Sequence, residues 1–184
     1  MQQNWDVTRE KMRALYHEVG DRNTDSRLVD VDGWWASPAI LGALGFLLAE
    51  PFRSSRVSVV LRPAASGYLL GPLVAIALGV GFVPVSKDPE TGVDSDAWRV
   101  RTTPPDYEDR HLELGFRRRL ISSSDRVLAV DDLVDSGAQL QTLQALIQDC
   151  GATWVGASVL IDNLGTGQRR RLLNLHAVFH IREP

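Results

Sequence analysis

Short apolar runs alternate along the chain with longer segments whose apolar residues recur every three or four positions. The apolar runs cover 57–61, 81–85, 126–130, 155–161 and 177–181, and each predicts a buried β-strand. Two of the segments with helical spacing cover about 68–78 and 137–150 and are followed by Gly79 and Gly151. Strands that alternate with helices predict an α/β fold, with a Rossmann-like parallel sheet covered by helices on both faces.

Two other stretches follow a different pattern. Near the N-terminus, helices are predicted at 6–19 and 37–49, the second with Ser37 as N-cap and Pro38 as its first residue. Residues 88–107 contain three prolines among Asp, Thr and Gly residues, which is typical of a loop that carries short strands at most. We therefore expect a single domain over 1–184, with N-terminal helices over 1–50 and a core over 51–162.

Composition and charge narrow the function classes. A formal net charge of −3 gives no electrostatic reason to expect nucleic-acid binding. The single cysteine, Cys150, excludes an internal disulfide and fits a reducing cytosol. The longest apolar stretch, 68–85, is interrupted by Gly and Pro, and no secretory signal is recognisable at the N-terminus. We expect a cytoplasmic protein that binds neither nucleic acid nor membrane.

The strongest candidate for chemistry is an acidic pair at the end of a predicted strand. Asp131 and Asp132 follow the run 126–130, and Gly137 opens the next predicted helix. Ligands bind at the carboxyl ends of parallel strands, and the free N–H groups of a helix start bind phosphate. Carboxylates beside a phosphate site suit a ribose 5-phosphate, whose hydroxyls and phosphate lie a few ångströms apart. The alternative is a capping aspartate in an ordinary strand-to-helix turn.

Two stretches resemble a known family. The run from Val127 to Gly137 resembles the phosphoribosyl diphosphate (PRPP) signature of the type I phosphoribosyltransferases, apolar residues followed by D-D-x-x-x-T-G-G-T. Residues 67–75 (GYLLGPLVA) and 78–85 (LGVGFVPV) resemble G-F-L-F-G-P-L-V-A and L-G-V-G-F-V-P-I of adenine phosphoribosyltransferases. The similarity spans roughly residues 28–162. It implies the type I fold with a small N-terminal hood, and the transfer of phosphoribose from PRPP to a base.

The resemblance implies a reaction and partners. Phosphoribose would pass from PRPP to a purine base, with adenine the leading candidate, and pyrophosphate would be released. Magnesium would be the cofactor, bound through the diphosphate and ribose oxygens, and the protein would form a homodimer. The four histidines show no spacing typical of a protein metal site, so no metal ligands are expected among the side chains.

The same resemblance implies roles for individual residues. Asp131 and Asp132 would hold the ribose hydroxyls, and Lys87, with Ser66 and Gly67, would lie near the pyrophosphate. Glu113, in a Leu-Glu-Leu-Gly stretch similar to the family's L-E-Y-G, would be a catalytic acid near the base. The 5-phosphate loop would consist of Asp135, also a catalytic candidate, with Ser136, Gly137, Ala138, Gln139 and Leu140.

The base site and the lid are also implied by the resemblance. Val31, Trp34 and Val85 would surround the base, and Trp34 or Trp35 would stack on it, unless these tryptophans are core anchors. Residues 88–111 would form a mobile lid that excludes water during the reaction. A surface loop is the alternative for this region.

Several positions depart from the family pattern. The family's D-S-R-G is Ala64-Ala65-Ser66-Gly67, and its R-K is Ser86-Lys87, so two arginines are missing. Each could supply a charge-assisted contact of a few kcal/mol. The candidates to replace them are Arg62, Arg99 and Arg101.

These departures leave two questions open. Adenine-specific members usually have a small residue at the position of Asp135, whereas relatives that act on oxo-purines or orotate often have Asp. The missing arginines also favour an alternative function, a non-catalytic sensor of PRPP or a nucleotide. A third possibility, a phosphorylated receiver module, is disfavoured because the acidic pair comes too late in the chain.

Overall fold

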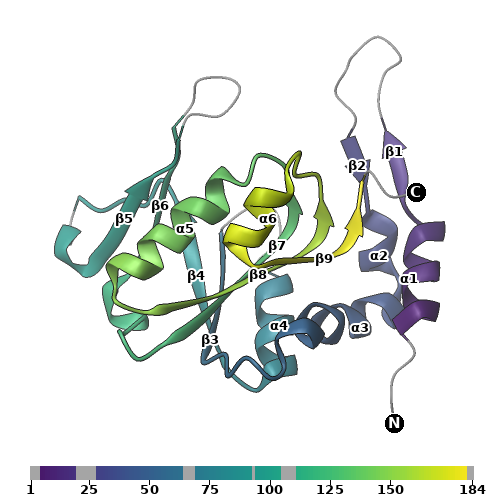
Figure 1. Ribbon diagram of the computed structural model, residues 1–184, viewed down its shortest axis with the longest axis horizontal. Coiled ribbons are helices and arrows are strands. Elements are labelled where there is room, and N and C mark those ends of the chain that lie inside the picture. The colour runs from purple at the N-terminus through teal and green to yellow at the C-terminus, as the bar shows by residue number, and fades with distance from the viewer. Residues whose placement is uncertain (1–4, 20–27, 64–68, 93, 105–110, 182–184) are drawn as a thin grey trace.

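The computed structural model describes residues 5–19, 28–63, 69–92, 94–104 and 111–181. Its centre is a seven-stranded sheet with the strand order β5-β6-β4-β3-β7-β8-β9 (Figure 1). Five strands run parallel: β3 (Val59–Pro63), β4 (Gly81–Lys87), β7 (Arg126–Val134), β8 (Thr153–Asp162) and β9 (Leu175–His180). At one edge β6 (Glu113–Arg117) runs antiparallel to β4, and β5 (Trp98–Thr102) runs antiparallel to β6. The predicted parallel sheet is confirmed, with an antiparallel edge added to it.

Helices cover both faces of this sheet (Figure 1). One face carries α3 (Pro38–Ala49) and α4 (Leu70–Leu78), and the other carries α5 (Ala138–Asp149) and α6 (Gly167–Leu173). Alternate strand residues point to the two cores, so Leu128 packs with α3 and α4 while Ala129 packs with α5. Because the central strands are buried on both faces, their sequences read as continuous apolar runs.

A smaller N-terminal layer lies beside β9 (Figure 1). It contains α1 (Trp5–Ala14), the antiparallel pair β1 (His17–Val19) and β2 (Leu28–Asp30), and α2 (Asp32–Ala36). The predicted helix over 6–19 is therefore wrong in its last part, because the chain leaves the helix after Ala14 and residues 17–19 pair with β2. Short 3-10 turns cover Glu50–Phe52, Ser95–Ala97 and Arg118–Leu120.

Local signals set several helix ends. The Ser37 hydroxyl accepts a hydrogen bond from the Ile40 N–H at 3.5 Å, and Pro38 is the first residue of α3, as predicted. Gly79 closes α4 in the left-handed conformation, with φ 71°. Within the described ranges, no helix combines the length and the apolar character needed to cross a bilayer.

Candidate functional site

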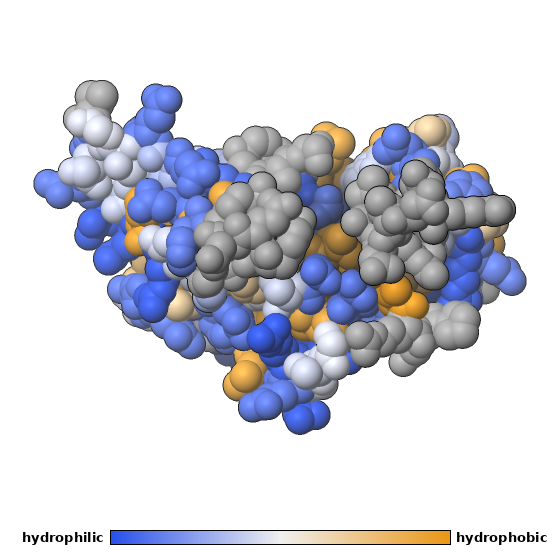
Figure 2. All heavy atoms as spheres, turned by 90° about the horizontal axis from the view of Figure 1, so that it is seen from above, coloured by the Kyte–Doolittle hydropathy of each residue, from blue (hydrophilic) through white to orange (hydrophobic). Residues whose placement is uncertain are grey.

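The candidate site lies along the carboxyl edge of the parallel strands. β3, β4 and β7 run in the same direction, so they end at this edge, and antiparallel β6 begins there. The edge therefore carries Lys87 at the end of β4, Glu113 at the start of β6 and the acidic pair on β7. With about 4.8 Å between strands, Lys87 lies roughly 10 Å from β7 and Glu113 roughly 15 Å. Figure 2, the view from above, shows mostly hydrophilic side chains with apolar surface between them.

The acidic pair lies within β7, not after it. The strand continues through Asp131 and Asp132 to Val134 because it keeps pairing with β8. Arg62, near the end of neighbouring β3, places its Nη2 atom 3.4 Å from Asp131 Oδ1 and 3.1 Å from Asp132 Oδ2. The Arg62 side chain is only 1% exposed, so one buried cation serves both carboxylates.

Burial changes the chemistry of Asp131. Loss of hydration, with a further contribution from the neighbouring Asp132 charge, raises the pKa of Asp131 to about 7, although Arg62 opposes the shift. Near neutral pH, Asp131 therefore gains and loses its proton readily. A carboxyl group in this state can accept a hydrogen bond from a sugar hydroxyl and can also donate one.

The turn from β7 into α5 has the geometry of an anion site. Gly137 is the N-cap of α5 with φ 78°, and a Cβ atom there would lie 3.1 Å from Leu164 Cδ2. The Ser136 hydroxyl accepts a bond from the Ala138 N–H at 3.3 Å. Within the described residues, the next two N–H groups, of Gln139 and Leu140, have no hydrogen-bond partner. The first turn of a twelve-residue helix therefore offers free donors and the positive end of its dipole to a phosphate.

The segment after β8 supports this turn. Asn163 donates from Nδ2 to Asp135 Oδ1 at 2.7 Å and from its backbone N–H to the Val134 carbonyl at 2.8 Å. Arg169 of α6 donates from Nη1 to the Ser136 carbonyl at 2.6 Å. The phosphate turn is thus bonded on its outer side to two residues that the sequence interpretation did not select.

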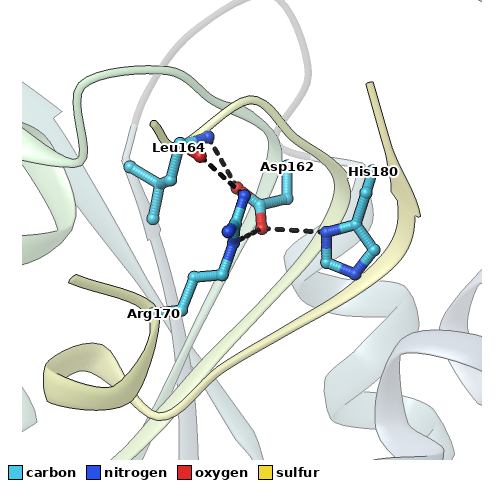
Figure 3. Close-up of polar contacts among 4 residues, drawn as sticks. All are labelled: Asp162, Leu164, Arg170 and His180. Atoms are coloured by element: carbon cyan, nitrogen blue, oxygen red, sulfur yellow. Dashed lines mark hydrogen bonds and ion pairs between the residues drawn. The ribbon is translucent and has the colours of Figure 1, made fainter. Parts of the chain in front are cut away.

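A buried carboxylate fixes the supporting segment in place (Figure 3). Asp162, 1% exposed at the end of β8, accepts hydrogen bonds from the Leu164 N–H at 2.7 Å and from Arg170 Nε. His180 Nδ1 of β9 lies 3.0 Å from Asp162 Oδ2, and Arg170 also donates to the Leu164 carbonyl at 2.6 Å. Asp162 therefore joins β8, β9 and α6 just before Asn163. The only sequence signal for Asp162 is its position at the end of an apolar run, and no motif accompanies it.

The predicted base residues lie in or near the cores. Trp34 is fully buried, donates from Nε1 to the Met12 carbonyl at 2.8 Å and packs 5.6 Å from the Phe179 ring. This geometry makes Trp34 a core anchor and does not present its face to a base. Val85 is also buried, in the core on the α5 side, whereas Val31 is half-buried at the N-cap of α2.

The remaining predicted residues are placed as follows. Lys87 is half-buried, and Glu113 is exposed, with its N–H bonded to Asp88 Oδ1 at 2.9 Å. Ser66 and Gly67 lie outside the described residues. His111 Nδ1 lies 3.1 Å from the Thr103 carbonyl, which places it beside β5.

Two of the three candidate replacement arginines lie elsewhere. Arg101 forms an ion pair with Asp149 at 2.7 Å, in the last turn of α5. Arg99 is half-buried and lies near Cys150. Burial raises the pKa of the Cys150 thiol, and the Arg99 charge opposes part of this rise. The last turn of α5 is about 16 Å from its first turn, so only Arg62 of the three reaches the acidic pair.

Comparison with protein-family profiles gives no match. Among characterised proteins, the chain is similar to the adenine phosphoribosyltransferase of Pectobacterium carotovorum subsp. carotovorum, with 34% identity over 149 residues, 79% of this chain and 76% of the relative. The adenine phosphoribosyltransferase of Maricaulis maris is 37% identical over 129 residues, 66% of this chain and 68% of the relative.

Solved structures agree on the fold. The adenine phosphoribosyltransferase of Rhodothermus marinus superposes with a TM-score of 0.80 at 24% identity, over 96% of this chain and 99% of that chain. The enzyme of Giardia lamblia, complexed with 9-deazaadenine, gives 0.79 at 22% identity, over 95% and 98%. The enzyme of Saccharomyces cerevisiae, complexed with an imino-altritol bisphosphate and adenine, gives 0.77 at 20% identity, over 94% and 97%. With its sequence matched over three quarters of both chains and its fold matched throughout, this chain belongs to the adenine phosphoribosyltransferase family.

Proposed function

We propose that the protein transfers phosphoribose from PRPP to adenine and releases pyrophosphate. The observation that carries this proposal is that one strand-to-helix connection has the Asp131 and Asp132 carboxylates at its start and the free N–H groups of Gln139 and Leu140 at its end. Carboxylates accept hydrogen bonds from ribose hydroxyls, and helix N–H groups bind the 5-phosphate. Both groups of a ribose 5-phosphate can therefore be held by one strand-to-helix connection.

Adenine is favoured as the base. The curated relatives are named for adenine, and two of the solved relatives were complexed with adenine or 9-deazaadenine. The aspartate that hinted at another base, Asp135, accepts a hydrogen bond from Asn163 and sits on the supported side of the phosphate turn. This bond gives Asp135 a role in the loop that does not depend on the base. The sensor alternative is not favoured, since the relatives are enzymes.

In the proposed reaction a ring nitrogen of adenine displaces pyrophosphate from the anomeric carbon. The transition state resembles an oxocarbenium ion, as in other glycosyl transfers. Asp131 and Asp132 hold the ribose while the α5 turn holds its phosphate, so the chain contributes mainly positioning and electrostatic stabilisation. Lys87 and Glu113 lie along the same edge, where the family resemblance assigns Lys87 to the pyrophosphate and Glu113 to the base.

Magnesium fits these residues as a cofactor. Magnesium is usually held by one or two carboxylates together with substrate phosphates, and the Asp132 side chain is 42% exposed. The described part of the chain contains no separate group of three His, Cys, Asp or Glu side chains that could hold a metal. The ion would stabilise the negative charge that develops on the departing pyrophosphate.

The test is turnover with defined substrates. Purified protein is mixed with PRPP, magnesium and one of adenine, hypoxanthine, guanine or orotate, and nucleotide and pyrophosphate are measured. Formation of AMP and pyrophosphate in equal amounts with adenine, well above the other bases, is the expected result. PRPP binding without product from any base would support the sensor and overturn the proposal.

We also propose a homodimer formed through α3 and α4. These two helices pack against each other and leave Phe46, Leu69 and Ile76 exposed, with Ile76 at 76%. Exposed apolar side chains on packed helices are typical of an interface. Sedimentation should give a dimer that Ile76→Asp shifts to monomer; a wild-type monomer would contradict the proposal.

The proposed function also assigns roles to the N-terminal segment and to the loop 88–111. Residues 1–50 would act as the hood, and 88–111, which include β5, would act as the lid over the carboxyl edge. A cytoplasmic location fits a nucleotide-forming reaction and the single cysteine. Protection of 88–111 from protease by PRPP and magnesium would support the lid, and unchanged cleavage would contradict it.

A further inference from the structure

Arg62 is a buried cation with few hydrogen-bond partners for its guanidinium. It is 1% exposed, yet within the described residues only Nη2 has partners, and the buried Nε and Nη1 atoms have none. Buried charged groups are costly unless they are paired and hydrogen-bonded, and a purely structural arginine would use its donors more fully. As far as the described residues show, the guanidinium therefore has two unused donors near the end of β3, beside the acidic pair.

Charge balance at this edge also points to Arg62. Two adjacent carboxylates would repel an anionic ligand such as PRPP and would repel each other. Arg62 lies within 3.4 Å of one carboxylate and 3.1 Å of the other, so it offsets both effects. The family's arginine in the β3–α4 connection is Ser66 in this chain, whereas the last two residues of β3 are Arg62 and Pro63.

We propose that Arg62 is the positioning residue of the ribose site, holding the Asp131 and Asp132 carboxylates for the sugar and supplying from β3 the charge that the family carries at the position of Ser66. This inference rests on the proposed function, because it names the cation that allows an acidic pair to accept PRPP. It adds Arg62 to the residues on which PRPP affinity depends.

Three variants test the proposal. Arg62→Met keeps a similar volume without charge, and such replacements of buried ions are often tolerated by the fold. Arg62→Lys keeps the charge, but its single ammonium lacks the Nε and Nη1 donors of the guanidinium and is carried on a differently shaped side chain. Arg53→Met removes an exposed arginine that pairs with Glu50 outside the site, and it serves as the control. Circular dichroism and thermal melting of each variant establish that it is folded.

The first readout is PRPP binding by calorimetry with magnesium between pH 5.5 and 8.5. Arg62→Met should weaken binding about tenfold or more, the loss of one charge-assisted contact, and Arg62→Lys should recover part of it. Arg62→Met should also move the pH below which binding weakens to a higher value, because the carboxylates lose their cation. A merely structural role would lower the melting temperature without moving this pH. Wild-type affinity and pH profile in Arg62→Met would overturn the proposal.

The second readout needs no ligand. Carbon-detected NMR titration of the aspartate side chains follows Asp131 directly in wild type, Arg62→Met and Arg53→Met. The Asp131 midpoint should rise by about half a pH unit or more only in Arg62→Met, which is roughly 0.7 kcal/mol at 1.36 kcal/mol per pKa unit. An unchanged midpoint would refute Arg62 as the positioning cation even if the protein does not bind PRPP. If wild type fails to bind PRPP but the midpoint moves, the proposed function fails and the coupling of Arg62 to the acidic pair stands.

Discussion

Replacement of Asp162 by alanine should destabilise the protein and loosen the phosphate turn together. The Asp162 carboxylate is buried and bonds the Leu164 N–H at 2.7 Å, an interaction with a charged partner that contributes about 1.5–3 kcal/mol. Arg170 and His180 are 32% and 36% exposed, so water replaces much of what they lose, and each adds at most about 1 kcal/mol. Together these contributions give an expected cost of about 1.5–5 kcal/mol.

The consequence for ligand binding follows from the neighbouring residues. Asn163 and Arg169 hold the outer side of the phosphate turn, and both follow Asp162 within eight residues. Asp162→Ala should therefore weaken PRPP binding several-fold. The two measurements are urea unfolding and PRPP calorimetry at the same pH.

A matched control is available on α6. Arg171 is an exposed neighbour of Arg170, and Arg171→Met should change the free energy of unfolding by no more than about 0.5 kcal/mol. If the free energy of unfolding of Asp162→Ala differs from wild type by no more than about 0.5 kcal/mol, the buried Asp162 cluster does not stabilise the fold as argued. If stability falls by the expected amount while PRPP affinity is unchanged, Asp162 does not support the phosphate turn.

Three further predictions concern the same site. Gly137→Ala should cost about 1–2 kcal/mol of stability and weaken PRPP binding, because φ is 78° and the new Cβ would lie 3.1 Å from Leu164. Urea unfolding measures the stability and calorimetry measures the binding, and a variant as stable as wild type would contradict the prediction. Asn163→Ala should raise the KM for PRPP a few-fold and leave the KM for adenine unchanged in steady-state assays; equal rises in both would count against a role in the phosphate turn. The folded-state pKa of Asp131 is raised from 3.8 to about 7, so its contribution to stability is fully present below pH 3.8 and is lost as pH rises towards 7. Asp131→Asn should therefore become more stable relative to wild type between pH 5 and pH 8. A difference in unfolding free energy that stays constant with pH would refute the shift.

Much of the core architecture was predictable because it depends on local patterns. The continuous apolar runs gave the central strands, and Ser37-Pro38 and Gly79 gave helix ends, since a cap or a left-handed residue acts within a few positions. β6 was missed, and β5 was expected only as a possible short strand within the loop 88–107, because both strands are partly polar and are defined by pairing with each other. β1 was assigned to a helix for a similar reason, since its partner β2 lies outside that segment.

The acidic pair and the turn into α5 were predictable from the sequence, whereas the residues that bond to them were not. Asp131, Asp132 and the α5 turn stand together in one continuous motif. Arg62 could be named only as one of three arginines, because its burial and its two ion pairs come from a neighbouring strand 69 residues away in sequence. Asp162 and Asn163 carry no motif, and their roles appear only when β8 lies beside β7.

The most direct test of the account is PRPP binding to a double variant, Asp131→Asn with Asp132→Asn, compared with wild type. Calorimetry with magnesium at pH 8 should show saturable binding to wild type and a loss of about a hundredfold or more in the folded double variant, since two carboxylate contacts to the ribose are removed. Equal affinity in a variant whose circular dichroism matches wild type would contradict the claim that the acidic pair of β7 holds the sugar.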